Sequence, residues 1–309
     1  MSLIEQAAQR LEQLRQAGVD MPSSPADLVS EPRLEQTPPK RPSNKSSSSA
    51  EREEPAVLQS PEMAMSRRVE LDLEILSAAG IIRPDAPRSQ LADEYRVIKR
   101  PLIDNAMGKG AVPIKDGNLI MITSALPGEG KTFTAANLAM SIAMELDNTV
   151  MLVDADVARP NLLKMLGLPP ARGLLDVLVD ESIDLPDVLL RTNVEKLTIL
   201  PSGTPHPRAT ELLASDAMVR LLEDMASRYA DRIIIFDSPP LLVTTEARTL
   251  ASHMGQVVIV VKAESTAHAD VRHALATIEA CPVKLMLLNQ AKTTAQDGYG
   301  YGYGYGYGN

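Results

Sequence analysis

The sequence has few cysteines, no tryptophan and no excess of positive charge. It contains one cysteine, Cys281, and no tryptophan among 309 residues. A single cysteine excludes a framework of internal disulfides and fits a reducing compartment such as the cytosol. The net charge is −9, which argues against the basic surface of a nucleic-acid-binding protein. We therefore expect no nucleic-acid partner.

Long hydrophobic runs are also missing. The first residues lack the apolar core of a signal peptide, and no apolar run approaches the roughly 20 residues of a membrane span. These absences predict a soluble cytoplasmic protein. Any recruitment to the inner face of a membrane would then depend on a partner.

The first 62 residues differ in character from the rest. Residues 1–18 are predicted to form an amphipathic helix, because apolar side chains recur at helical spacing between a Ser2–Glu5 capping box and Gly18. This helix either docks on a partner or packs on its own domain, and the sequence favours neither. Residues 19–62 are rich in proline and serine and predict a disordered linker, because they bury too little apolar surface to offset their ordering entropy.

Residues 63–295 carry the patterns of one folded domain. A short helix ending near Gly80 comes first, followed by a helix that Ser89 caps and that Pro101 should kink or restart. Strand and helix patterns then alternate, and most strands are continuous apolar runs, as in a parallel sheet covered on both faces. Predicted strands cover 118–124, 149–154, 196–200, 232–237, 256–262 and 283–289; predicted helices cover 131–146, 160–166, 173–179, 209–228, 244–253 and 267–279.

The segment Ser124–Thr132 (SALPGEGKT) fits a phosphate-binding loop between a strand and a helix. Gly128 and Gly130 allow backbone N–H groups to turn toward phosphate oxygens. The following helix directs its positive end at the same site. Lys131 has the length to reach the β- and γ-phosphates, and the Thr132 hydroxyl suits Mg²⁺. The domain is therefore predicted to be an α/β P-loop NTPase with a mostly parallel sheet and helices on both faces.

Three carboxylates follow two other strands at the same edge of this sheet. Asp154 and Asp156 end the run VMLVDAD, and Asp237 ends the run RIIIFD. A nucleotide site needs one such carboxylate for Mg²⁺, whereas a kinase has a use for more, to orient or deprotonate the accepting hydroxyl. Either residue of the first pair, Asp156 more than Asp154, has the alternative role of capping the next helix.

The segments ALPGEGKT, LVDADVARP and IIIFDSPP, in this order, resemble the Walker A, Walker A′ and Walker B motifs of bacterial tyrosine kinases, a deviant Walker branch of P-loop proteins. The resemblance covers about residues 63–309. The N-terminal MSLIEQAAQRLEQLR, the linker and EYRVIKRPL are similar, more narrowly, to tyrosine autokinases associated with exosortase and exopolysaccharide gene clusters.

The resemblance implies a protein-tyrosine autokinase that uses ATP and Mg²⁺ and that regulates exopolysaccharide synthesis or export. It implies catalytic roles for Lys131, Asp154 and Asp156, with one aspartate as the base. The implied metal ligands are Thr132, Asp154 and Asp237. The implied nucleotide contacts are Gly128, Glu129, Gly130, Lys131, Thr132, Phe133 and Asn289, the last beside adenine.

The resemblance also implies partners. Members of this family assemble into rings through a Glu-x-x-Arg-x-x-Arg helix, and the matching positions here are Asp93, Arg96 and Lys99. Two of the three differ conservatively, which puts an identical ring contact in doubt. A homo-oligomer is still implied. The membrane-spanning polysaccharide chain-length or co-polymerase activator of the family is implied to be a separate polypeptide.

The last fourteen residues, 296–309, form a Gly-Tyr tail. Its five tyrosines alternate with glycine, which keeps phenols exposed on a flexible chain. Beside a P-loop with an extra acidic pair, they are the expected phosphoacceptors: Tyr299, Tyr301, Tyr303, Tyr305 and Tyr307. The alternative is a low-complexity aromatic segment with no role in phosphorylation. About ten flexible residues span roughly 18 Å, which favours transfer in trans to a neighbour. Five phosphates would add roughly −8 to −10 charges, enough to disfavour an oligomer.

Two other functions are compatible with the sequence. One is a switch ATPase of the partition or septum-positioning type, although these proteins usually have an extra lysine early in the P-loop, and Ser124–Pro127 contains none. Such proteins also bind DNA or membrane through a basic amphipathic C-terminal helix, which the sequence lacks. The other is an inactive scaffold that only binds nucleotide.

Overall fold

The computed structural model describes residues 67–85, 88–110 and 112–292, which lie in one compact unit, Gln59–Asn309. The predicted N-terminal helix, linker and Gly-Tyr tail fall outside the described residues. None of the helices in the described residues combines the length and the hydropathy of a membrane-spanning segment.

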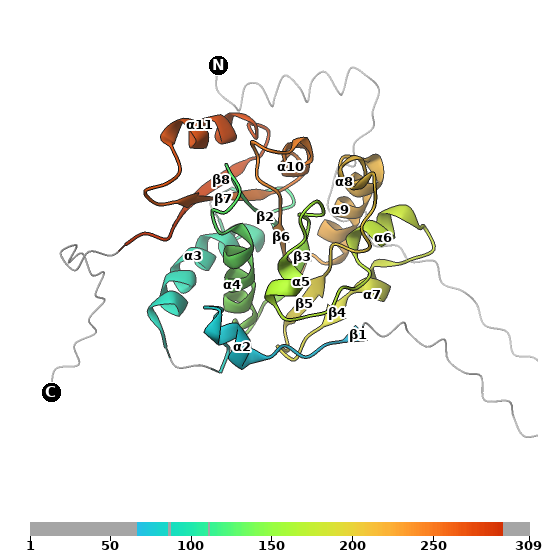
Figure 1. The fold of residues 1–309 in the computed structure, drawn as a ribbon, viewed down its shortest axis with the longest axis horizontal. Coiled ribbons are helices and arrows are strands. Elements are labelled where there is room, and N and C mark those ends of the chain that lie inside the picture. The colour runs from blue at the N-terminus through green and yellow to red at the C-terminus, as the bar shows by residue number, and fades with distance from the viewer. Residues whose placement is uncertain (1–66, 86–87, 111, 293–309) are drawn as a thin grey trace, which may run out of the picture. The chain divides into compact units, whose positions relative to one another are not determined.

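An eight-stranded sheet forms the centre of this unit (Figure 1). All neighbouring strands run parallel except β4 and β5, which are antiparallel. In sheet order the strands are β1 Arg67–Arg68, β4 Leu190–Arg191, β5 Leu197–Leu200, β3 Thr149–Asp154, β6 Arg232–Asp237, β2 Leu119–Ser124, β7 Gln256–Lys262 and β8 Val283–Asn289. The mostly parallel sheet predicted from the sequence is thereby confirmed.

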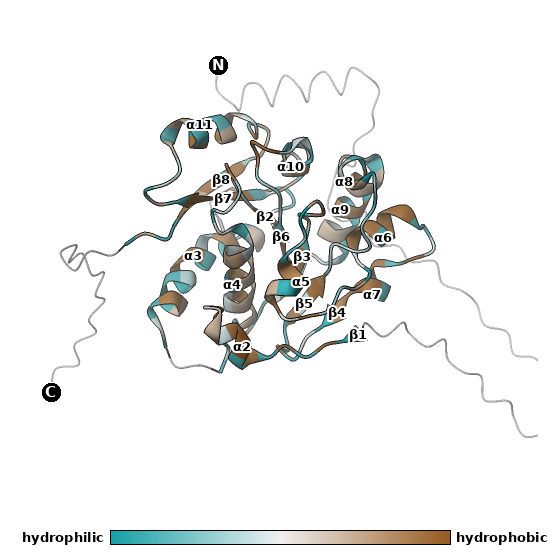
Figure 2. Cartoon of the chain, in the orientation of Figure 1, coloured by the Kyte–Doolittle hydropathy of each residue, from teal (hydrophilic) through white to brown (hydrophobic). Residues whose placement is uncertain are grey.

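Helices cover both faces of the sheet, and each face has its own apolar core. One core packs Leu102 and Leu138 against the sheet, and the other packs Leu222 and Leu250. The strands between them are brown in Figure 2, whereas the helices carry teal patches. The first face is covered by α2 Leu73–Ala78, α3 Gln90–Ala106, α4 Lys131–Ala143 and α5 Leu162–Met165. The second is covered by α6 Leu174–Val179, α7 Leu185–Val188, α8 Ala209–Leu213, α9 Asp216–Arg228, α10 Thr245–Ala251 and α11 His268–Ala276.

Several predicted boundaries need correction. The helix expected over 209–228 is two helices, because Ser215 ends the first and caps the second: its hydroxyl donates to the Leu212 carbonyl and accepts from the Met218 amide. The helix capped by Ser89 continues through Pro101 without restarting. The sequence patterns did not predict β1, β4 and α7, which are only two to four residues long.

The positions that match the family's ring-assembly motif form contacts within their own chain. Arg96 pairs with Asp93 on α3 itself. Lys99 is buried, and its ammonium donates to the Ser141 carbonyl of α4 and lies 2.7 Å from the Glu145 carboxylate. Lys99 therefore anchors α3 on α4 and does not face outward.

The register of the central strands brings the predicted site residues together. β6 lies between β3 and β2, and Asp154 at the end of β3 is directly opposite Asp237 at the end of β6. β2 runs beside β6 and ends at Ser124, where the phosphate-binding loop begins. All three motifs therefore meet at the carboxyl edge of the sheet, where ligands of such folds bind.

Candidate active site

The loop between β2 and α4 has the backbone of a phosphate cradle. Gly128 and Gly130 have φ of 80° and 97°, a left-handed conformation that residues with a Cβ rarely adopt. A Cβ on Gly130 would also lie 2.1 Å from the Asn289 amide nitrogen. α4 begins at Lys131, directly after this turn, so its free N–H groups lie beside the loop.

Glu129 and Asn289, which the sequence predicts to contact nucleotide, form hydrogen bonds that support the loop. The buried Glu129 carboxylate accepts from the Leu126 amide at 2.8 Å and from the Thr266 hydroxyl. Asn289, which ends β8, donates to the Glu129 carbonyl at 2.9 Å. Neither side chain lines the pocket, so their direct contact with nucleotide stays a prediction.

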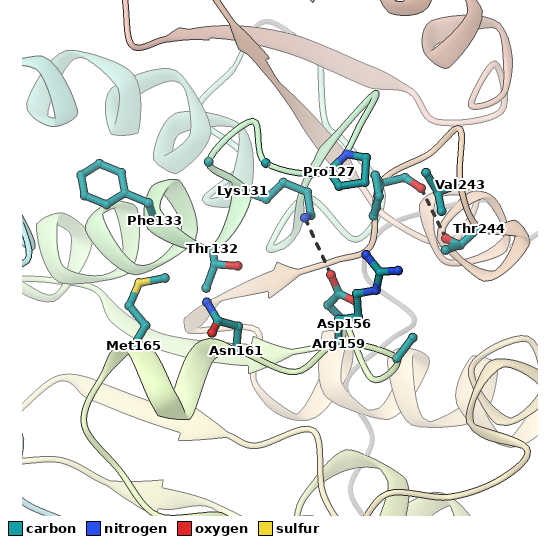
Figure 3. A pocket seen from close by; sticks show the side chains of 14 residues that line it. Pro127, Lys131, Thr132, Phe133, Asp156, Arg159, Asn161, Met165, Val243 and Thr244 are labelled. Carbon is teal, nitrogen blue, oxygen red and sulfur yellow. Dashed lines mark hydrogen bonds and ion pairs between the residues drawn. The ribbon is translucent and has the colours of Figure 1, made fainter.

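A pocket of about 500 Å³ opens in front of the loop (Figure 3). Lys131 and Asp156 point toward each other across it, with Thr132 and Asn161 on one side and Pro127, Val243 and Thr244 on the other. Its lining comprises Pro127, Gly128, Gly130, Lys131, Thr132, Phe133, Asp156, Ala158, Arg159, Asn161, Met165, Pro240, Val243 and Thr244. The structure therefore places four of the predicted nucleotide-loop residues, with Phe133 and Asp156, around one cavity.

The electrostatics of the pocket centre on Lys131 and Asp156. The Lys131 ammonium lies 3.7 Å from the Asp156 carboxylate, and each residue is only 9% exposed. Burial raises the pKa of Asp156, and the positive charge of Lys131 partly offsets that rise. Lys131 is thus held extended across the pocket by a carboxylate that phosphate oxygens would replace as its partner.

Asp154 and Asp237 are more deeply buried, and only one of their four carboxylate oxygens has a hydrogen bond within the described part of the chain. Oδ2 of Asp154 accepts from the Leu162 amide at 3.3 Å. Burial, with repulsion from Asp237, raises the pKa of Asp154 to about 8. Burial also raises the pKa of Asp237 to about 7, although Thr132 and Lys131 lower it in part. Unpaired buried carboxylates of this kind call for a cation.

The residues present fit Mg²⁺ with a nucleotide. Among residues 67–292, apart from the short gaps, no group of three or more His, Cys, Asp or Glu side chains is placed to hold a metal unaided. Asp154 and Asp237 offer carboxylate oxygens, and Thr132 adds a hydroxyl at the start of α4. Mg²⁺ in nucleotide sites takes its other ligands from phosphates and water, so this donor set suffices.

Asp154 also lines a second cavity, of about 450 Å³, which Asp156 does not line. Its walls are mainly apolar and come from the segment after β3 and the turn after β5. They comprise Pro160, Leu163, Lys164, Leu168, Pro170, Ala171, Ser202, Gly203 and Pro205. The two aspartates of one motif therefore face different spaces: Asp156 faces the pocket of the phosphate-binding loop, and Asp154 faces the neighbouring cavity.

Sequence reasoning missed several pocket residues. Arg159 is exposed at the pocket, and its position three residues after the acidic pair was the one signal that could have identified it. Asn161, Met165, Val243 and Thr244 come from turns and short helices without any motif. The predicted phosphoacceptors, Tyr299 to Tyr307, lie outside the described residues.

Comparisons with known proteins agree with this geometry. The profile of the AAA domain family matches residues 117–290. The tyrosine-protein kinase YwqD of Bacillus subtilis (strain 168) is 32% identical over 228 residues, which cover 71% of this chain and 89% of YwqD. The succinoglycan biosynthesis transport protein ExoP of Rhizobium meliloti (strain 1021) is 35% identical over 181 residues, 58% of this chain. The match spans only 22% of ExoP.

A solved structure supports the same assignment. The chimerical protein CapA2B2 superposes with a TM-score of 0.56 at 27% identity, covering 72% of this chain and 93% of its own. The shared α/β fold, with the P-loop between β2 and α4 and the two strand-end aspartates, is that of a P-loop NTPase. The chain therefore belongs to the bacterial tyrosine-protein kinases and is itself a protein-tyrosine kinase.

Proposed function

We propose that the chain transfers the γ-phosphoryl group of ATP to tyrosines of its own C-terminal tail, in trans, within a homo-oligomer. The observation that carries the proposal is the pair of buried carboxylates, Asp154 and Asp237, at the ends of neighbouring strands. Three of their four oxygens have no hydrogen bond among the residues that the structure describes. The two carboxylates supply more acidic groups than nucleotide binding alone needs. The tyrosine-kinase relatives favour this function over a switch ATPase of the partition type.

We propose a role in the reaction for each of these side chains. Lys131 and the N–H groups of the loop stabilise charge on the transferring phosphoryl group. Bound Mg²⁺, held by Thr132, Asp154 and Asp237, would supply further positive charge to the phosphates. The phenol oxygen attacks the γ-phosphorus in line, and the bond to the β–γ bridging oxygen breaks. Asp154 takes the phenol proton, because it ends β3 beside the phosphate-binding loop and faces the mainly apolar cavity, which suits a phenol ring.

The biological setting is proposed from the named relatives. ExoP is named as a succinoglycan biosynthesis transport protein. Together with the resemblance of the N-terminal segments, this name supports a role in exopolysaccharide synthesis or export. We place the kinase in the cytoplasm, recruited to the inner face of the membrane by a separate co-polymerase polypeptide that activates it.

Transfer in trans is tested by mixing two variants, neither of which is expected to phosphorylate itself. One chain carries Lys131→Met and an intact tail, and the other has an intact site but ends after Asp297. Incubation of the mixture with Mg·ATP is expected to phosphorylate the Lys131→Met chain, because the truncated chain supplies the site and the other supplies the phenols. Intact mass distinguishes the two chains and counts phosphates.

Each chain incubated alone is the control and should gain no phosphate. A mixture that also gains none, while the intact chain phosphorylates itself, would show that transfer is intramolecular and would overturn the trans proposal. Phosphate on the truncated chain would show that the acceptors are not the tail tyrosines.

A further inference from the structure

The last strand of the sheet leaves part of one apolar face uncovered. Met286 and Leu288 of β8 are 64% and 63% exposed. They pair in register with Ile259 and Val261 of β7, so they extend the face on which the core with α9, α10 and α11 is built. The buried core on this face therefore ends at β7. The two β8 side chains lie next to it on the same face of the sheet and are exposed to solvent.

α11 turns this open face into a groove. A cavity of about 580 Å³ lies between the helix and the end of β8, which are neighbours in Figure 1. Val271 and Leu275 line it from the helix, and His268 and Arg272 add two nitrogen-bearing side chains. A groove of this kind suits an uncharged segment with large apolar or aromatic side chains.

The chain leaves the sheet at the end of this groove. Gln290, just after β8, has φ of 58°, so the backbone turns away from the strand direction. Lys292 is the last described residue, and its ammonium lies 3.0 Å from the Glu264 carboxylate. Glu264 lies in the short connection between β7 and α11, only four residues before the helix begins at His268. The remaining chain, residues 293–309, therefore starts where α11 and the end of β8 meet.

The chemistry of that remaining chain matches the groove. No charged side chain follows Asp297, and five of the next residues are tyrosines that alternate with glycine. When such a chain is extended, its phenol rings share one side and glycine leaves the other side bare. A sulfur next to aromatic rings is a favourable contact, and Met286 presents one. The nine residues of α11 span about 13 Å, which about four extended residues match.

We propose that the unphosphorylated Gly-Tyr tail docks in cis in the groove between α11 and β8, with tyrosine rings on Met286 and Leu288. Docking covers the open end of the core and competes with delivery of the same tyrosines to an active site. Phosphorylation adds about −1.5 to −2 charges per tyrosine, which an apolar groove with Arg272 as its one permanent cation does not accommodate. The groove thus binds the substrate form of the tail and releases the product form.

Chymotrypsin tests the docking, because it cleaves after exposed tyrosines. The parent chain carries Lys131→Met, so the tail stays unphosphorylated and the result does not depend on kinase activity. The test chain adds Met286→Glu and Leu288→Glu, and the matched control adds Leu146→Glu, at an 87% exposed position outside the groove. Cleavage follows the undocked fraction, so a tail docked nine-tenths of the time is cut about tenfold more slowly than a free one.

We expect the groove variant to lose its tail several-fold faster than the parent, and the Leu146→Glu chain to match the parent. Equal rates in all three chains would overturn the proposal. Protection that rises with protein concentration would also overturn it, in favour of docking in a second copy. Hydrogen exchange tests the same docking without substitutions on β8. Truncation after Asp297 should speed amide exchange in residues 283–289, and unchanged exchange would contradict docking.

Discussion

Replacing Lys131 with methionine is expected to lower tail phosphorylation about a thousandfold or more, which in most assays is a complete loss. The ammonium is the one lysine charge in the lining of the phosphate pocket, and methionine keeps the length of the side chain without the charge. Removing a group that stabilises charge developing in the transition state commonly has an effect of this size. Phosphotyrosine formed by the purified variant, measured by intact mass, gives the rate.

The same substitution is expected to leave the fold intact. Asp156 loses its cationic partner, so its already raised pKa should rise further and the carboxylate should take up a proton. The melting temperature should therefore change by only a few degrees, and Lys115→Met, at an exposed lysine, is the matched control. A Lys131→Met chain that remains folded and still phosphorylates its tail would show that the catalytic site lies elsewhere.

Asp154→Asn is expected to separate activity from stability. An amide does not accept the phenol proton and is a poorer magnesium ligand, so transfer should fall about a hundredfold or more. Without Mg²⁺ at pH 8, however, the variant should be more stable than the parent by about 2–4 kcal/mol, because asparagine removes an unpaired buried charge.

The expected fall in stability with rising pH follows from the raised pKa of Asp154. The folded protein holds the Asp154 proton up to about pH 8, whereas the unfolded chain releases it near the ordinary pKa of about 4. The stability from this group is thus fully present below pH 4 and is lost as the pH rises to 8. The Mg²⁺-free parent should lose stability over this range, and the Asp154→Asn variant should lose less.

Urea unfolding at pH 5 and pH 8, with and without Mg²⁺, measures the difference. Asp231→Asn, at an exposed carboxylate, is the control and should follow the parent at both pH values. An Asp154→Asn chain that is less stable than the parent at pH 8 without Mg²⁺ would mean that the Asp154 charge is compensated in the folded state.

The central part of the fold followed from the sequence for physical reasons. Buried parallel strands need apolar side chains on both faces, so β2, β3, β6 and β7 appear as continuous apolar runs. Phosphate-loop chemistry needs glycine, lysine and threonine at fixed spacing, and strand ends bring Asp154 and Asp237 together whatever lies between them. These constraints are local or follow from the parallel topology, which is why they could be predicted.

Other features depend on contacts that no local pattern encodes. β1 and β4 have two residues each and exist only through their pairing with distant strands. Arg159 and Val243 reach the pocket because two separate turns fold over it. The support of the loop by Asn289 joins segments 160 residues apart. The open face of β8 became visible only when the exposure of Met286 was known.

Intact mass of the purified chain after incubation with Mg·ATP, beside the chain truncated after Asp297, shows whether the protein phosphorylates the tyrosines of its own tail. We expect stepwise gain of phosphate on the full chain, up to five, and no gain on the truncated one. Release of ADP without any mass change, when the co-polymerase partner is present, would contradict this expectation and identify the protein as a nucleotide hydrolase.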